Sequence, residues 1–310
     1  MEIIETDKKN YENLMLCPFS VFDTVAFCEL NRNKTDDLKY LVFYDGKNRF
    51  ALAAGIKGDV LKLPFSASFA VLSPITRNNK IICFHESVRA LSDWAKARGC
   101  RKVVFSLPPH FYEPTYLTML YNALWNEGYR VEDIEVNFEY YLKDFSAEGY
   151  EMSIDPKARQ KLRASLKNDL SFEKTDDLDT VYGIIKINRE YRGFPLWMSL
   201  EDVRKTRQAV DMDFFLVRNS EGRPMASALV YHITDKIVRV IYWGNIPEGE
   251  NLRVMNFLAF HVFEYYKRMS YEIIDIGHST DDSIPNYGLC DFKQAIGCKS
   301  SPKFVFVKDL

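Results

Sequence analysis

Residues 272–297 read EIIDIGHSTDDSIPNYGLCDFKQAIG, and this stretch decides how the chain is organised. Its apolar beginning, residues 272–276, predicts a short strand. A polar strand end follows, with Asp275, Ser279 and Thr280 close together. A helix is then expected to end at Gly297, because glycine commonly closes helices. This order of strand, polar strand end and helix can be sought elsewhere in the chain.

One pattern of elements occurs twice. Each copy is a β-meander, a helix, a short strand, a second helix and a last strand, with the meanders at residues 40–44, 50–56 and 60–65 and at 214–217, 226–232 and 237–243. The spacing agrees between the copies. Gly46 to Val104 spans 58 residues where Gly222 to Ile274 spans 52. The sequence therefore predicts two related halves, as its length of 310 residues also favours.

The expected fold class is α/β, with two tandem lobes that each hold a mixed, mostly antiparallel sheet flanked by helices. We place the lobes at residues 1–150 and 151–310. Asp155 and Pro156 predict the start of a helix, because aspartate caps helices and proline suits the first turn. Residues 199–202, Ser-Leu-Glu-Asp, predict a capping box.

Composition excludes several classes of protein. The hydrophobic fraction is 47% and the charged fraction 27%, which is typical of a folded globular chain. A net charge of −2 gives no general attraction to DNA or to an anionic membrane. The opening MEIIETDKKN is unlike a signal peptide, and no apolar run is long enough to span a membrane. We expect a cytoplasmic protein. No metal site is expected, because the histidines lack metal-ligand spacing.

The predicted order of elements resembles the GNAT acyltransferase fold, and two such lobes in tandem resemble the Fem-type (FemAB-like) peptidyl and aminoacyl transferases. The best single motif is residues 275–279, similar to the family's D-x-G-R-S strand end, followed by Phe292-Lys293 and Gly297. The resemblance implies that Asp275, Ser279 and Lys293 are catalytic. His278 stands where the family has an arginine, and the resemblance makes it and Asn286 substrate-binding candidates.

Two further stretches carry the resemblance. The first is the basic helix at 157–170, where Arg159, Arg163 and Lys167 fall on one stripe. This stripe is either a solvated charged face or an anion-binding site. In the second, residues 188–196, Arg189 and Arg192 come near the end of a helix that is expected to close at Gly193. They either clamp a substrate anion or form surface salt bridges to Glu190 or Asp202.

The strand end at residues 242–244 is the last candidate. Tyr242, Trp243 and Gly244 are either strand-end packing residues or part of a substrate groove, where glycine lets a ligand approach the backbone. Acyl transfer needs a deprotonated amine, a carbonyl at attack distance and a stabilised oxyanion. We assign the oxyanion to main-chain amides at 242–244 and proton removal to Asp275.

The family offers two donors. Residues 246–253 contain one glycine and two glutamates, where CoA-dependent GNAT enzymes have an R-x-x-G-x-G/A phosphate loop. We therefore expect no permanently bound cofactor, and either acyl-CoA or aminoacyl-tRNA as co-substrate. The expected function is transfer of an acyl or aminoacyl group to a small-molecule or peptide-like amine, with tRNA as a further partner of the aminoacyl option. The alternative is a non-catalytic GNAT-like binding module for RNA, peptide or an envelope precursor.

Overall fold

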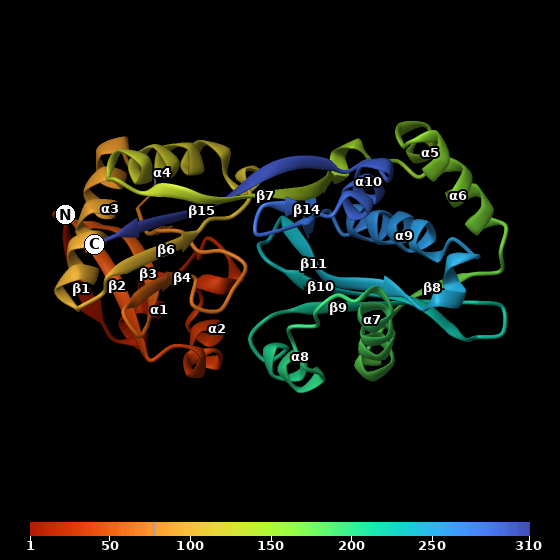
Figure 1. The fold of residues 1–310 in the computed structure, drawn as a ribbon, viewed down its shortest axis with the longest axis horizontal. Helices are drawn as coiled ribbons and strands as arrows, with labels where there is room; N and C mark the ends of the chain where they lie inside the picture. Colours follow the sequence, from red (N-terminus) through yellow and green to blue (C-terminus); the bar gives the residue numbers. More distant parts are fainter. Residues whose placement is uncertain (77) are drawn as a thin grey trace. The chain divides into compact units, whose positions relative to one another are not determined.

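The structure is a computed structural model that describes residues 1–76 and 78–310. Contacts divide the chain into two compact units, Met1–Val136 with Ser301–Leu310, and Asn137–Ser300 (Figure 1). This division differs from the expected boundary at 150/151. Strand β7 (Arg130–Tyr141) crosses from unit 1 into unit 2, and strand β15 (Lys299–Asp309) crosses back. Each unit therefore contains a strand segment from the other half of the sequence.

Unit 1 contains a sheet in the order β1-β2-β3-β4-β6-β15. Strands β4 and β6 are parallel, and the other neighbours are antiparallel. The elements, besides short 3-10 turns, are β1 (Glu2–Thr6), α1 (Lys8–Leu14), α2 (Val25–Leu30), β2 (Asp37–Tyr44), β3 (Asn48–Lys57), β4 (Val60–Leu63), β5 (Ser73–Pro74, paired with β3), α3 (Ile81–Ala97), β6 (Lys102–Ser106) and α4 (Pro114–Asn126).

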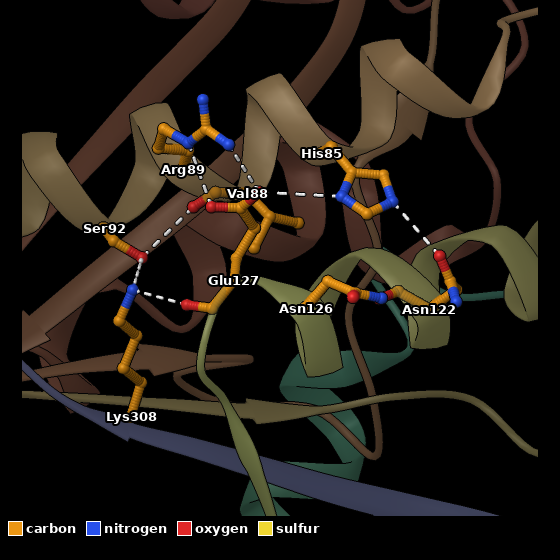
Figure 2. Close-up of polar contacts among 8 residues, drawn as sticks. All are labelled: His85, Val88, Arg89, Ser92, Asn122, Asn126, Glu127 and Lys308. Atoms are coloured by element: carbon orange, nitrogen blue, oxygen red, sulfur yellow. Dashed lines mark hydrogen bonds and ion pairs between the residues drawn. The ribbon is translucent and has the colours of Figure 1, made fainter.

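A polar cluster joins α3, α4 and β15 in unit 1 (Figure 2). Glu127, which follows α4, accepts two hydrogen bonds from Arg89 of α3 at 2.9 and 3.0 Å and lies 3.6 Å from His85. Lys308 of β15 donates to the Glu127 carbonyl at 2.7 Å and to Ser92 at 3.4 Å. These contacts secure residues 301–310 within unit 1.

Unit 2 contains the order β7-β12-β11-β10-β9-β8, in which only β11 and β12 are parallel among the strand pairs described. Helices α7 and α8 cover one face of the sheet, and α9 and α10 cover the other (Figure 1). The elements are α5 (Tyr150–Ser153), α6 (Pro156–Leu166), β8 (Ser171–Thr175), α7 (Leu178–Arg192), α8 (Leu200–Thr206), β9 (Met212–Arg218), β10 (Pro224–His232), β11 (Ile237–Asn245), α9 (Val254–Arg268), β12 (Ile273–His278), β13 (Thr280–Asp281), β14 (Ile284–Pro285) and α10 (Tyr287–Ala295).

Local signals set the helix boundaries of unit 2 as predicted. Asp155 caps α6, and the Ser199 capping box begins α8 with Asp202 as its reciprocal partner. Helix α7 ends at Gly193, whose φ of 68° is the left-handed conformation that glycine adopts most easily. The central strands β9 and β10 are buried nearly throughout, because helices cover both faces of the sheet. No described helix is long and apolar enough to cross a bilayer.

Candidate functional site

Strands β11 and β12 separate early, and this separation positions the candidate site. Their parallel pairing runs only from Ile237 and Ile273 to Arg239 and Asp275, although β11 continues to Asn245. Two bulges flank this point. Ile241 of β11 has no partner in the register of β10 with β11. Ile276 of β12 likewise has no partner in the register of β7 with β12. Bulges bend and twist a strand, so the two strands part beyond them.

Asp275 lies at the start of the separation and is fully buried. Its carboxylate is ion-paired with Arg239 of β11. It also accepts hydrogen bonds from the Asn137 side chain of β7 and from the Gly277 amide, both at 2.8 Å. A buried charge requires such partners. Asp275 therefore links three neighbouring strands, and its carboxylate is already paired and shielded from solvent where the sequence suggested a proton acceptor.

Lys293 of α10 reaches the end of β12. Only 2% of it is exposed, and its amine donates to the carbonyls of Gly277 at 2.8 Å and of His278 at 3.1 Å. Burial lowers the pKa of Lys293 from 10.5 to about 7, and the nearby Asp275 only partly opposes this shift. An amine with a pKa near neutrality can both give and take a proton under physiological conditions.

Ser279 follows directly on β12 and is 3% exposed. Its hydroxyl is buried and has no hydrogen-bond partner among the described residues. Leaving a buried hydroxyl unpaired costs about 1–3 kcal/mol, and the Ser279 hydroxyl is free to donate or accept a hydrogen bond at this strand end. The Ser279 carbonyl accepts from the Asn286 amide at 2.8 Å, while the Asn286 side chain caps α10. His278, between Gly277 and Ser279, is exposed.

Arg189 of α7 is half-buried between two aromatic rings. Its guanidinium centre lies 5.3 Å from the Tyr242 ring centroid and 5.9 Å from that of Phe194. Burial lowers the pKa of Arg189, with Tyr242 opposing the shift. Its Nε is buried without a hydrogen-bond partner, and no ion pair forms with any residue in 1–76 or 78–310. Such an arginine is suited to binding a ligand anion.

The two arginines of α7 are in different environments. Arg192 is exposed and ion-paired with Glu250 at 2.7 Å, so the salt-bridge interpretation describes Arg192, although with a different partner from those expected. Arg189 fits the clamp interpretation. Sequence reasoning did not single out Phe194, which follows the helix-ending Gly193 and stacks on Arg189. The available signal was an aromatic residue directly after a helix-closing glycine.

Tyr242 and Trp243 lie on opposite faces of β11, as strand alternation requires. Tyr242 contacts Arg189 of α7, while Trp243 packs edge-on against Phe292 of α10 at 6.0 Å between ring centroids. The space above Gly244 is occupied by Asn188, because a Cβ there would lie 2.5 Å from the Asn188 Cγ. Gly244 therefore allows α7 to pack closely on β11, and a ligand cannot approach it on that face.

The basic stripe of α6 is divided in the structure. Arg163 is ion-paired with Glu151 at 2.6 Å, and Arg159 is partly buried, with a terminal nitrogen 3.4 Å from the Met152 carbonyl. Lys167 caps the end of the helix and is exposed. The three side chains thus do not form one free cationic face.

The segment before α9 differs from a phosphate-binding loop. Residues Pro247–Glu250 form a 3-10 turn, and Glu248 pairs with Arg223. The amides of Gly249, Arg253 and Asn256 donate to carbonyls within the segment, so they do not point outward to a phosphate. No cluster of three or more potential metal ligands occurs among the described residues.

Comparisons with solved structures identify the fold. The chain is similar to the crystal structure of FemX at 14% identity, with 100% of this chain and 98% of that chain covered and a TM-score of 0.73. It is also similar to the C-terminal domain of a protein named as a lysylphosphatidylglycerol synthetase from Agrobacterium fabrum (14% identity, 98% and 93% covered, TM-score 0.63). A third is a tandem GNAT protein from the clavulanic acid biosynthesis pathway (11%, 99% and 98%, TM-score 0.56).

No family model matches the sequence, and no curated protein matches it. At these low identities the structural likeness establishes the fold alone. The expected fold class is confirmed, as a mixed sheet in a mostly antiparallel arrangement flanked by helices. The chain therefore has a tandem GNAT-like fold similar to that of FemX, as the order of its elements predicted.

Proposed function

We propose that the protein transfers an acyl or aminoacyl group to an amine at the place where β11 and β12 separate. The observation that carries this proposal is that two polar groups meet the end of β12: the buried amine of Lys293, which donates to the carbonyls of Gly277 and His278, and the hydroxyl of the next residue, Ser279, which has no hydrogen-bond partner among the described residues. A fold alone does not define an activity, but buried polar groups with altered pKa values concentrate at reacting sites.

The reaction balances without a covalent enzyme intermediate. The acceptor nitrogen attacks the donor carbonyl carbon, a C–N bond forms, and the bond from that carbon to the CoA sulfur or the tRNA ribose oxygen breaks. The proton lost by the amine is the proton that the leaving group requires. In this proposal Lys293 carries that proton and, when charged, stabilises the oxyanion together with Ser279. Asp275, paired with Arg239, acts as a positioning residue that fixes Gly277.

Of the two donors, aminoacyl-tRNA is favoured. The segment before α9 has no glycine-rich loop to bind a pyrophosphate. The arginines beside it, Arg192 and Arg223, already pair with its glutamates Glu250 and Glu248. Of the basic side chains of α6, the exposed Lys167 is the proposed contact for a tRNA phosphate, because Arg163 is ion-paired with Glu151 and Arg159 is partly buried. His278 and Asn286, next to Ser279, are proposed substrate contacts.

The test is a donor assay. Purified protein is incubated with acyl-CoAs or with mixed aminoacyl-tRNA, with and without a pool of amines, and release of free CoA or of uncharged tRNA is measured. We expect acceptor-dependent release that Lys293→Met lowers at least about 100-fold. Release from neither donor by folded protein would refute the enzyme proposal. Saturable donor binding without release would instead establish the binding-module alternative, which the ion-paired state of Asp275 favours.

A further inference from the structure

The surroundings of Arg189 contain an exposed aromatic side chain held by a fixed loop. Trp197, in the connection between α7 and α8, is 83% exposed. Its neighbour Met198 is held from two sides, since Tyr182 donates to the Met198 carbonyl at 2.9 Å and the Tyr231 hydroxyl lies 3.5 Å from the Met198 sulfur. An indole exposed on a restrained loop is available to a ligand with little ordering of the protein.

The same connection links the indole to the unpaired cation. It begins at Gly193, and Phe194 then packs over the Arg189 guanidinium and is itself 38% exposed. On its inner side, Arg189 contacts Tyr242, which lies on β11 beyond the last residue that pairs with β12. Arg189, whose Nε has no hydrogen-bond partner among the described residues, therefore lies against β11 beyond its paired residues, and the exposed rings of Phe194 and Trp197 belong to the connection that begins at the end of the same helix.

We infer that this region binds the acceptor, and that the acceptor carries an anionic group beside an apolar ring or chain. The carboxylate or phosphate pairs with Arg189, and the apolar part packs on Trp197 and Phe194. This inference rests on the proposed function, because it identifies the anion as part of the molecule whose amine reacts. Arginine suits both anions, since its planar fork pairs bidentately with either.

Binding can be measured by calorimetry on the full chain with small probes. N-acetylphenylalanine and phenyl phosphate combine an anion with a ring, N-acetylphenylalanine amide keeps the ring without the charge, and acetate and inorganic phosphate lack the ring. We expect each ring-bearing anion to bind at least about tenfold more tightly than the neutral amide and than the simple anions. The stronger of the two ring-bearing probes then distinguishes a carboxylate from a phosphate acceptor.

The variants assign the site. Arg189→Gln should abolish the preference for anions over the neutral amide, while Arg192→Gln, three residues along the same helix, should preserve it because Arg192 is already paired with Glu250. Trp197→Ala should weaken all ring-bearing probes equally. Arg189→Lys retains the charge and should retain part of the preference. It provides a second test of the site in case Arg189→Gln does not fold. Equal binding of acid and amide, or an unchanged preference in Arg189→Gln, would overturn the inference.

Lys293→Met separates this inference from the proposed function. If both hold, this variant binds the probes normally and fails to transfer. Normal transfer with no selective probe binding would refute the acceptor inference only. Selective probe binding by a wild-type protein that transfers nothing would refute the proposed function and leave the anion site in place.

Discussion

The two units differ at their parallel strand pairs, β4 with β6 in unit 1 and β11 with β12 in unit 2. In unit 1, β4 has four residues, and all of them pair with β6. The chain then closes over the strand ends, because Phe65 packs on Gly55 and the Ala70 amide donates to the Ser106 carbonyl at 2.9 Å. In unit 2, β11 has nine residues and its first three pair with β12.

The difference lies in what fills the space beyond the paired residues. In unit 1 the chain that follows β4 runs through Phe65, which packs on Gly55, and through the fully buried Val71 and Leu72. Unit 2 places the charged pair of Asp275 and Arg239, the amine of Lys293 and the unpaired hydroxyl of Ser279. Buried polar groups destabilise a fold unless they are matched, so this group of polar side chains beyond the paired residues of β11 and β12 marks a candidate working site in unit 2.

The largest expected effect comes from breaking the buried ion pair. Asp275→Ala removes the buried carboxylate that pairs with Arg239 and accepts from Asn137 and the Gly277 amide, which should lower the free energy of unfolding by about 3–5 kcal/mol. Urea denaturation followed by circular dichroism measures this loss. Asp179→Ala is the matched control, since the exposed pair of Asp179 with Arg204 should contribute under about 1 kcal/mol. Similar losses in both variants would contradict a special role for the buried pair.

The second effect is a pH dependence from Lys293. Its folded pKa of about 7 lies below the unfolded value of 10.5, so the unfolded chain binds more protons between these values and stability rises with pH. From pH 7 to pH 9 the expected gain is about 2 kcal/mol. Lys293→Met should remove this slope and be more stable than wild type at pH 7. Parallel slopes in the two proteins would show that the amine is not desolvated.

A third effect is a loss of stability at acidic pH, and it comes from Asp213, a buried carboxylate of unit 2 that has several hydrogen-bond donors. Burial alone would raise the pKa of Asp213, but hydrogen bonds from His232, Lys174 and Tyr266 outweigh it and lower the pKa from 3.8 to about 2. The stabilisation is therefore complete above pH 3.8 and lost as pH falls through 2.

The free energies of unfolding of wild type and Asp213→Asn should therefore converge as the pH falls from 3.8 through 2. Asp213 should contribute between about 1 and 2 kcal/mol to the free energy of unfolding, and this contribution is lost on protonation. A constant difference between the two proteins from pH 5 to pH 2 would contradict the assigned pKa.

The smallest effect has an unusual sign. Ser279→Ala removes an unpaired buried hydroxyl, so it should leave stability unchanged or raise it by up to about 1 kcal/mol while lowering transfer. Thermal melting and the donor assay measure the two quantities. Ser227→Ala is the control, because the Ser227 hydroxyl donates to the Val181 carbonyl at 2.9 Å and its removal should destabilise.

The sequence predicted what depends on local signals. The repeated order of elements, the caps at Asp155 and Ser199 and the end of α7 at Gly193 all follow from residue types at short spacing. The motif at 275–279 with Lys293 also located the strand end where the buried polar groups meet. These features need no knowledge of which strands are neighbours in the sheet.

Long-range pairing was beyond the sequence. Arg239 sits inside an apolar strand, and nothing near it indicates that its partner is Asp275, 36 positions away. The bulges next to the separation arise from the registers of neighbouring strands, and the aromatic contacts of Arg189 depend on a loop that returns to α7. The crossing of β7 and β15 between the units likewise has no local signature.

That crossing has a consequence for how the protein is made. A ribosome synthesises residues 1–136 first, yet the strand that pairs with β6 comes from residues 305–309, which emerge only after the whole of unit 2. Until then one edge of the nascent first sheet stays open to unwanted partners. Unit 1 therefore cannot be completed before the whole of unit 2 has been synthesised.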